Sequence, residues 1–309
     1  MRRSNSISEP DLISTEPIPR RGMIGGIIAT ARPRQWIKNL LVLAAPLASG
    51  DLSDVGALLA VGVAFVAFCL CASSIYLLND SLDIEADRAH PKKRFRPIAA
   101  GEVPIAAAWA SFVVLLVAGV ALGFVVNVLL GLVLLVYCVV QIAYCFWLKH
   151  IAVLDIAVVS SGFLLRAVAG GAAAGIALSQ WFLLVAIFGS LLMVAGKRYG
   201  EIVSDHEAAA TRRSLKHYTP SYLRFIWQSA AAIVVIVYSL WTFEGEVAAG
   251  GDQRLAITIV PFVLAIFRYC QHIDSGDAEA PEEIAAHDRL LQVLAAVWLI
   301  VLFLCLYLP

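Results

Sequence analysis

The chain has 309 residues, of which 61% are hydrophobic and 15% are charged, and its mean hydropathy is +0.83. A soluble domain averages about 45–50% apolar and about 25% charged residues, so this composition excludes an ordinary soluble protein and predicts a multi-pass membrane protein. The formal net charge is zero and by itself says nothing about partners; no nucleic-acid partner is expected.

Residues 1–31 are polar at their start and rich in Pro and Ser, and no sufficiently long apolar core follows the first arginines. This pattern is not that of a secretory signal. We predict a cytosolic tail that is disordered over residues 1–20, with a short interfacial segment at Met23–Ala31. The remainder, residues 32–309, is predicted to be one transmembrane domain.

Nine apolar runs have, or nearly have, the roughly 20 residues that a bilayer-spanning helix needs. They are approximately Trp36–Ser49, Val55–Leu78, Val103–Val126, Val128–Leu148, Ile151–Ala174, Gln180–Gly196, Tyr222–Phe243, Leu255–Tyr269 and Leu290–Leu308. The first and the eighth runs are short. Either their ends lie beyond the apolar residues, or these two helices are tilted. The six cysteines all lie in apolar runs without a CxxC pair, so we expect small buried side chains with no redox role. The fold class is therefore an all-α membrane protein with nine transmembrane helices.

The positions of Lys and Arg orient these helices, because cytosolic loops carry an excess of both residues. With the N-terminus in the cytosol, only Arg254 of the 23 Lys and Arg falls on the outer side, and only Arg166 lies within a span. The outer loops carry acids instead: Asp51, Asp54, Glu244, Glu246 and Asp252. We predict a cytosolic N-terminus and, after nine crossings, a C-terminus outside the membrane.

An acidic stretch, Asn79–Asp87, directly follows the second apolar run. On a continuing helix at about 100° per residue, Asp83 lies near 40° from Asn79, Asp87 near 80° and Asp80 near 100°, whereas Glu85 lies on the other side near 240°. Three carboxylates on one face repel one another and favour a bound cation, and all-oxygen ligation suits Mg²⁺. The alternative is a solvated acidic helix end.

A second polar stretch, Lys197–Asp205, ends the sixth run and aligns with the first after a shift of 118 positions. Glu201 then coincides with Asp83, and Asp205 with Asp87. We interpret this as a weak internal repeat that brings two helix ends together around one pocket. Lys197, Glu201 and Asp205 share a face, which favours a phosphate clamp with one further metal ligand; a simple Lys–Glu helix pair stays open as the alternative.

Cations near these stretches are candidate phosphate ligands, with Arg the better bidentate partner. They come from the loop after the acidic stretch, from the first span and from the helix ends around the fifth span: Lys93, Arg94, Arg96, Arg34, Lys38 and Lys149. Arg166, inside a span, must be paired or face a polar cavity. Asp155 is three turns away on the same face, too far for direct pairing.

The nine runs and the pattern Asn79-Asp80-x-x-Asp83-x-x-x-Asp87 resemble the UbiA-type intramembrane prenyltransferases. The resemblance implies a nine-helix bundle around a cytosol-facing, laterally open pocket, with Mg²⁺ as the cofactor. The second motif departs from the usual Asp-x-x-x-Asp form, because it reads Gly196-Lys197-Arg198-Tyr199-Gly200-Glu201. With Arg32–Asn39 and Arg96-Pro97-Ile98, it is similar to one branch, the decaprenyl-phosphate phosphoribosyltransferases.

Resemblance to this branch implies transfer of 5-phosphoribosyl from phosphoribosyl diphosphate to a polyprenyl phosphate, with release of pyrophosphate, in cell-wall arabinan precursor synthesis at the bacterial inner membrane. Asp80, Asp83, Lys197 and Glu201 are then expected to be catalytic, and Asp80, Asp83 and Asp87 to hold Mg²⁺. Expected substrate-binding residues are Asn79, Arg34, Lys38, Lys93, Arg94, Arg96, Tyr144, Lys149, Arg166, Arg198 and Asp205. The oligomeric state, a homo-oligomer included, stays open.

Other functions are less consistent with these patterns. An aromatic prenyltransferase that consumes a prenyl diphosphate is the main alternative, but Lys197 and Arg198 in the second motif argue against it. A transporter would carry its charges in mid-span, whereas here they cluster at cytosolic helix ends. A scaffold without chemistry would not need two aligned polar faces.

Overall fold

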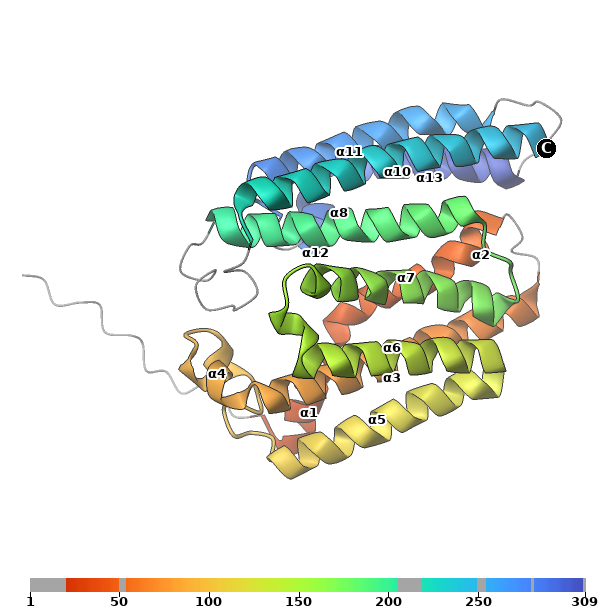
Figure 1. Ribbon diagram of the computed structural model, residues 1–309. Helices are drawn as coiled ribbons and strands as arrows, with labels where there is room; N and C mark the ends of the chain where they lie inside the picture. Colours follow the sequence, from red (N-terminus) through yellow and green to blue (C-terminus); the bar gives the residue numbers. More distant parts are fainter. Residues whose placement is uncertain (1–20, 50–53, 205–217, 249–253, 279–280, 308–309) are drawn as a thin grey trace, which may run out of the picture.

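The computed structural model describes residues 21–49, 54–204, 218–248, 254–278 and 281–307. Within these ranges the chain is helical throughout and contains no strand, so the predicted all-α class is confirmed. The long helices run alongside one another, up and down, as one bundle (Figure 1).

The elements follow one another along the chain in an order that matches the apolar runs. They are α1 Met23–Ala31, η1 Pro33–Leu43, α2 Ala44–Ser49, α3 Val55–Leu82, α4 Ile84–Ala89, η2 Lys93–Phe95, α5 Ile105–Val126, α6 Val128–Phe146, η3 Leu148–His150, α7 Leu154–Ala174, α8 Gln180–Ser204, α10 Pro220–Ala248, η5 Leu255–Thr258, α11 Ile259–Asp274, α12 Pro281–His287 and α13 Arg289–Tyr307. The predicted interfacial segment is helix α1, whereas residues 1–20 lie outside the described ranges.

Eight helical segments of the described chain are long and apolar enough to cross a membrane. Eight of the nine predicted runs correspond to them, and the first run is the exception. It forms the 3₁₀-helix η1 and then the short helix α2. A 3₁₀-helix rises about 2.0 Å per residue, against about 1.5 Å for an α-helix. The 11 and 6 residues of η1 and α2 therefore reach roughly 30 Å, although a run of this length would be short as an α-helix.

Helix η1 is held against α7 by a close backbone approach. A Cβ atom at Gly170 would lie 1.9 Å from the carbonyl oxygen of Val42. Only a glycine allows this contact, because neither backbone can move cheaply. Four residues earlier on α7, Arg166 Nε donates a 2.7 Å hydrogen bond to Asn39 Oδ1 of η1. These two contacts fix η1 along α7.

Replacing Gly170 with Ala should therefore lower the stability of the protein by about 1–3 kcal/mol, the usual cost of overpacking. Thermal unfolding of the detergent-solubilised protein measures the effect. Gly189→Ala is the matched control, because a Cβ at Gly189 of α8 would meet no atom within 4 Å. Equal melting temperatures for the two variants would contradict the close approach.

The apolar core consists of two main clusters that meet at α7. One joins η1, α3 and α6 to the second half of α7, with Phe68 and Leu134 fully buried. The other joins Ile156 at the start of α7 to α8, α10 and α11. Figure 1 shows α7 between α6 and α8, with α5 on one outer side and α10, α11 and α13 on the other. Helix α7 is thus placed to connect the two halves of the bundle.

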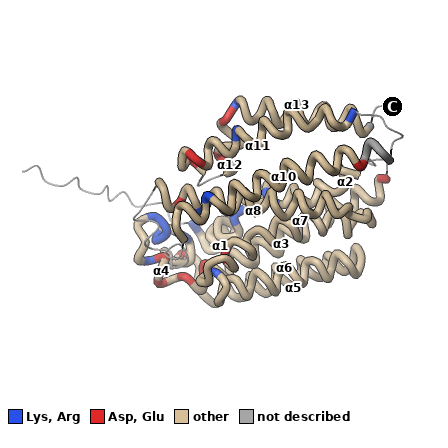
Figure 2. Tube along the Cα trace, turned by 45° about the horizontal axis from the view of Figure 1, so that its top comes forward, with Lys and Arg blue, Asp and Glu red and all other residues tan. Residues whose placement is uncertain are grey.

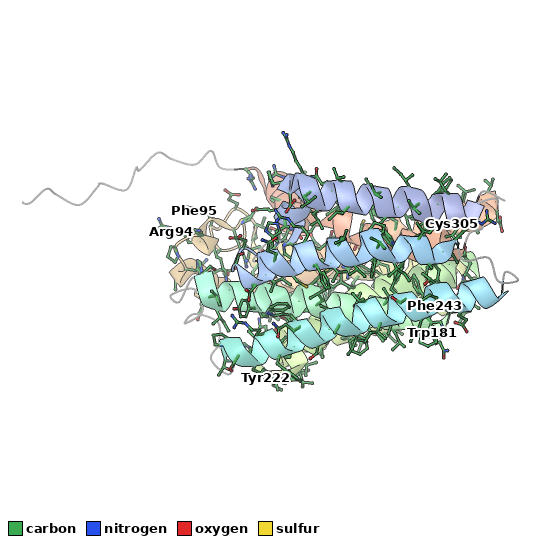
Figure 3. The ribbon with its side chains drawn as sticks, turned by 90° about the horizontal axis from the view of Figure 1, so that it is seen from above. Arg94, Phe95, Trp181, Tyr222, Phe243 and Cys305 are labelled. Carbon is green, nitrogen blue, oxygen red and sulfur yellow. The ribbon has the colours of Figure 1, made fainter. Side chains whose placement is uncertain are left out.

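Charged residues gather at one end of the bundle, around α4 (Figure 2). Arg94, Phe95 and Tyr222 lie at this end, whereas Trp181 and Cys305 lie at the opposite end (Figure 3). All six cysteines are free thiols; four are buried, but Cys270 and Cys305 are only partly so. Most charged residues of the predicted acidic stretch and basic loop therefore lie at one end of the bundle.

Candidate active site

Three carboxylates of the acidic stretch, those of Asp80, Asp83 and Asp87, each lie beside a basic side chain. Asp80 is 2% exposed and accepts hydrogen bonds from Arg32 Nη2 at 2.8 and 3.1 Å and from Arg96 Nη1 at 3.1 Å. The same Arg96 nitrogen donates to Asp87 Oδ2 at 2.8 Å. Asp80 and Asp87 therefore hold the guanidinium of Arg96 between them. This agrees with the prediction that the two carboxylates share one helix face.

The helix that carries these acids bends at Asp83, which the sequence does not predict. Helix α3 ends at Leu82, and Asp83 has φ −94° and ψ 12°. Backbone bonds from Asp83 N to Asn79 O and from Asp87 N to Asp83 O keep the helical register across the bend. The side chain of Asp83 instead meets Lys149, whose Nζ donates to Asp83 Oδ1 at 2.6 Å. Lys149, from η3, is thus brought to the acidic stretch.

Burial raises the pKa of Asp87, and the guanidinium of Arg96 opposes that shift. Asp87 is only 3% exposed, so its charged form depends on a cationic partner. Glu85, by contrast, is exposed, in agreement with its predicted position on the other side of the helix.

Arg32, which was not among the predicted site residues, binds Asp80. It follows α1 in the left-handed conformation, with φ 53°, and its guanidinium lies 4.6 Å from the centre of the Tyr76 ring. A left-handed non-glycine residue is uncommon. The selected neighbour, Arg34, is exposed and remains a predicted phosphate ligand. The only sequence signal for Arg32 is its position directly before a helix-starting proline.

The second polar stretch is organised by Arg198 rather than by Lys197. Arg198 is 3% exposed, and its three guanidinium nitrogens all donate to carboxylates. Nε and Nη2 reach Asp155 of α7 at 2.9 and 3.2 Å, and Nη1 reaches Glu201 at 2.9 and 3.2 Å. The open alternative of a Lys197–Glu201 pair does not occur in the structure. Asp205 lies outside the described residues.

A cavity of about 680 Å³ lies between η1, α2, α7 and α8. Its polar lining side chains are Lys38, Tyr144, Lys197 and Arg198, and the rest of the lining is apolar: Ile37, Leu40, Leu41, Ala44, Leu47, Val159, Phe163, Met193, Val194, Pro281 and Ala285. Several of the apolar residues, including Ile37 and Leu47, are also exposed on the outside of the bundle. The cavity can therefore accept a long apolar group with an anionic end.

A model of the UbiA prenyltransferase family matches residues 40–292 of the chain. The chain belongs to this family. It is 54% identical to the decaprenyl-phosphate phosphoribosyltransferase of Mycolicibacterium smegmatis over 295 residues, which cover 91% of this chain and 92% of that protein. The protein of the same name from Corynebacterium glutamicum is 50% identical, with 94% of this chain and 89% of that protein covered.

Solved structures of the family share the fold. A UbiA homologue from Archaeoglobus fulgidus, bound to GPP and Mg²⁺, superposes with a TM-score of 0.71 at 17% identity and covers 91% of this chain and 99% of its own. The chain is thus a multi-pass membrane enzyme of the UbiA transferase type.

Arg166 occupies a different place from the other cations of this UbiA-family protein. Its side chain is 8% exposed inside the bundle, bonded to Asn39 Oδ1, to the carbonyl of Gly162 at 2.6 Å and to the hydroxyl of Tyr137 at 3.3 Å. The rings of Phe68, Tyr137 and Phe163 surround the guanidinium at 5.2–5.8 Å. As the sequence predicts, Arg166 does not pair with Asp155. It is not among the residues that line the cavity, and its contact with substrate stays a prediction.

The predicted basic loop is built around η2, at the tip of the charged end. Lys93 and Arg94 are exposed, and Arg94 lies over the Phe95 ring at 4.8 Å. Arg88 Nε is tied to the carbonyl of Ala99 at 3.0 Å. Arg96 of this loop bonds to Asp80 and Asp87. Lys93 and Arg94 stay predicted ligands of a soluble phosphate.

The acids that would hold a metal ion each have a basic partner. Among the described residues, no three His, Cys, Asp or Glu side chains come together as a metal cluster. The donor set nevertheless fits a hard cation, because Asp80 and Asp87 bridge one nitrogen of Arg96 through carboxylate oxygens. A metal ion that bound both acids would take the place of the Arg96 guanidinium.

Proposed function

We propose that this enzyme transfers 5-phosphoribosyl from phosphoribosyl diphosphate to a polyprenyl phosphate, with decaprenyl phosphate as the expected acceptor, and releases pyrophosphate. The observation that carries the proposal is the apolar cavity lined by Lys38 and Lys197, in a protein that also holds a cluster of acids and arginines around Asp80. The names of the relatives, at 50–54% identity, support it.

The acceptor would bind in the cavity. Its apolar chain would lie along η1, α2 and α8, where lining residues also reach the outer surface, and would leave sideways into the bilayer. Its phosphate would meet Lys38 and Lys197. A phosphate dianion needs cations in a low-dielectric site, and two lysines from different helices supply them.

The donor would bind at the acidic wall, the face formed by Asp80, Asp83 and Asp87. Asp80, Asp83 and Asp87 would hold Mg²⁺, which when bound neutralises charge on the departing diphosphate. Arg96 and Lys149, released from the acids, would then face the phosphates of the donor, as would Arg34, Lys93 and Arg94. Glu201, held by Arg198, would accept a hydrogen bond from a ribose hydroxyl.

The reaction would form one bond from an acceptor phosphate oxygen to C1 of the ribose and break the bond from C1 to the diphosphate, with inversion. The acceptor oxygen is already ionised, so no general base is required. The rate enhancement would come from positioning and from preorganised charge.

The proposed topology places this site in the cytosol, at the plasma membrane. The segment η1–α2 would cross the membrane first and would bring the number of crossings to nine. The N-terminus would then lie inside and the end of α13 outside. The end of α13 lies at the end of the bundle opposite the charged end. There Cys305 of α13 donates a hydrogen bond to the carbonyl of Arg254. Residues 32–309 would form the transferase domain behind a cytosolic tail, and the product would enter the synthesis of cell-wall arabinan.

A donor screen tests the proposal. Purified protein in detergent should release pyrophosphate from phosphoribosyl diphosphate only when both a polyprenyl phosphate and Mg²⁺ are present. Geranyl and longer prenyl diphosphates, offered with aromatic acceptors, should give no turnover. Consumption of a prenyl diphosphate instead would identify the aromatic prenyltransferase.

A further inference from the structure

A buried network connects α6, α7 and α8 beside the cavity. Asp155 is fully buried and accepts from Tyr144 at 2.7 Å as well as from two nitrogens of Arg198. Arg198 in turn holds Glu201, three residues further along α8. Two-point bonding between a guanidinium and a carboxylate fixes both distance and orientation.

The start of α7 is held in a strained conformation next to this network. Val153 has φ 70°, in the left-handed region that a β-branched residue avoids. Its amide donates a 2.6 Å bond to the hydroxyl of the buried Tyr218. Among the described residues, the other non-glycine residue with positive φ is Arg32, which binds Asp80. Such strain costs about 1–3 kcal/mol and persists where the surroundings impose it.

The consequence for Lys197 follows from helix geometry. Neighbouring residues of an α-helix point about 100° apart. When Arg198 is fixed against α7, Lys197 is turned toward the cavity, which it lines. Glu201 is held by Arg198, which donates to both of its oxygens.

We propose that Asp155 is a positioning residue: by holding Arg198 at two points, it fixes the rotation of α8, so that Arg198 retains Glu201 and Lys197 enters the cavity to receive the phosphate of the lipid acceptor. The assignment rests on the proposed function, since the lipid phosphate is the anion that Lys197 would meet. Arg198 then acts through Glu201 and Lys197 and is not itself a phosphate ligand.

Equilibrium binding of tritiated decaprenyl phosphate to the detergent-solubilised full chain, without donor, tests the assignment. Asp155→Asn should weaken binding about tenfold, and Lys197→Met should weaken it to a similar extent, as expected for loss of one charge-assisted contact. The double variant should bind no more than about threefold worse than Lys197→Met alone, because both changes remove the same contact. Fully additive losses, unchanged binding or tighter binding by Asp155→Asn would each overturn the proposal.

Two further variants guard against a simple loss of folding. Tyr218→Phe removes the hydroxyl that holds Val153 but leaves the ion pairs intact, and it should weaken binding in the same direction. Asp288→Asn is the matched control. It breaks the 2.7 Å pair between Arg268 of α11 and Asp288, the residue before α13; neither residue lines the cavity, so binding should be unchanged. Failure of the wild-type protein to bind the lipid would contradict the proposed function as well, whereas wild-type binding with unaffected Asp155 and Tyr218 variants contradicts the positioning role alone.

Discussion

Replacement of Asp80 by Asn is expected to lower the rate of pyrophosphate release at least about 100-fold, the scale on which loss of one preorganised charge contact reduces catalysis. The amide keeps the size of the side chain but removes the charge that Arg32 and Arg96 face at 2.8 and 3.1 Å. It also removes a ligand of the proposed Mg²⁺. Turnover with saturating phosphoribosyl diphosphate and lipid acceptor, together with the melting temperature, measures the effect.

Glu85→Gln is the matched control for this change. Glu85 belongs to the same acidic stretch but is exposed and faces away from the other acids, so its variant should retain full activity. Asp83→Asn should lower turnover strongly as well, because Asp83 holds Lys149 and is a proposed metal ligand. Full activity of Asp80→Asn or Asp83→Asn, in folded protein, would refute the metal assignment.

Replacement of Lys197 by Met should lower turnover at low lipid concentration at least about tenfold, and the loss should appear mainly as a raised KM for the polyprenyl phosphate. Met keeps the apolar stem of the side chain against the cavity but removes the ammonium. The KM for phosphoribosyl diphosphate should change little, because the proposed donor site lies at the acidic wall. Steady-state kinetics with each substrate varied in turn separate the two effects.

Arg224→Gln provides the control for a lost cation on the neighbouring helix. Arg224 of α10 is half-exposed and contacts Asp274 at 3.5 Å, outside the cavity. Its variant should keep both KM values. A rise in the KM for phosphoribosyl diphosphate alone in Lys197→Met would place Lys197 at the donor instead of the acceptor.

Local patterns were enough to predict most of the helices and the acidic wall. Apolar length predicted nine spans, eight of which match helices of the structure, and the 100° period separated Asp80 and Asp87 from the exposed Glu85. The same patterns could not predict the form of the first span. Its length in space depends on a 3₁₀ conformation that the contact of Gly170 with Val42 helps to hold, and those residues lie on different helices.

The partners of the charged residues also lay beyond the reach of the sequence. Arg32 is 48 positions from Asp80, and Lys149 is 66 positions from Asp83. Spacing along a helix compares only neighbours three or four residues apart. It left a Lys197–Glu201 pair open as an alternative and could not identify Arg198 as the partner of both Asp155 and Glu201, which packing of α8 on α7 decides.

The sequence by itself determined that this protein is an all-α membrane protein, which residues gather at its charged end, and the family to which it belongs. These properties follow from composition, period and motif, which are local. Only the tertiary structure decided which cation meets which carboxylate. Each buried charge must find a partner, and the packing of η1, α3, α7 and α8 determines which partners are within reach. That selection tied Arg198, which also lines the cavity, to Asp155 and Glu201.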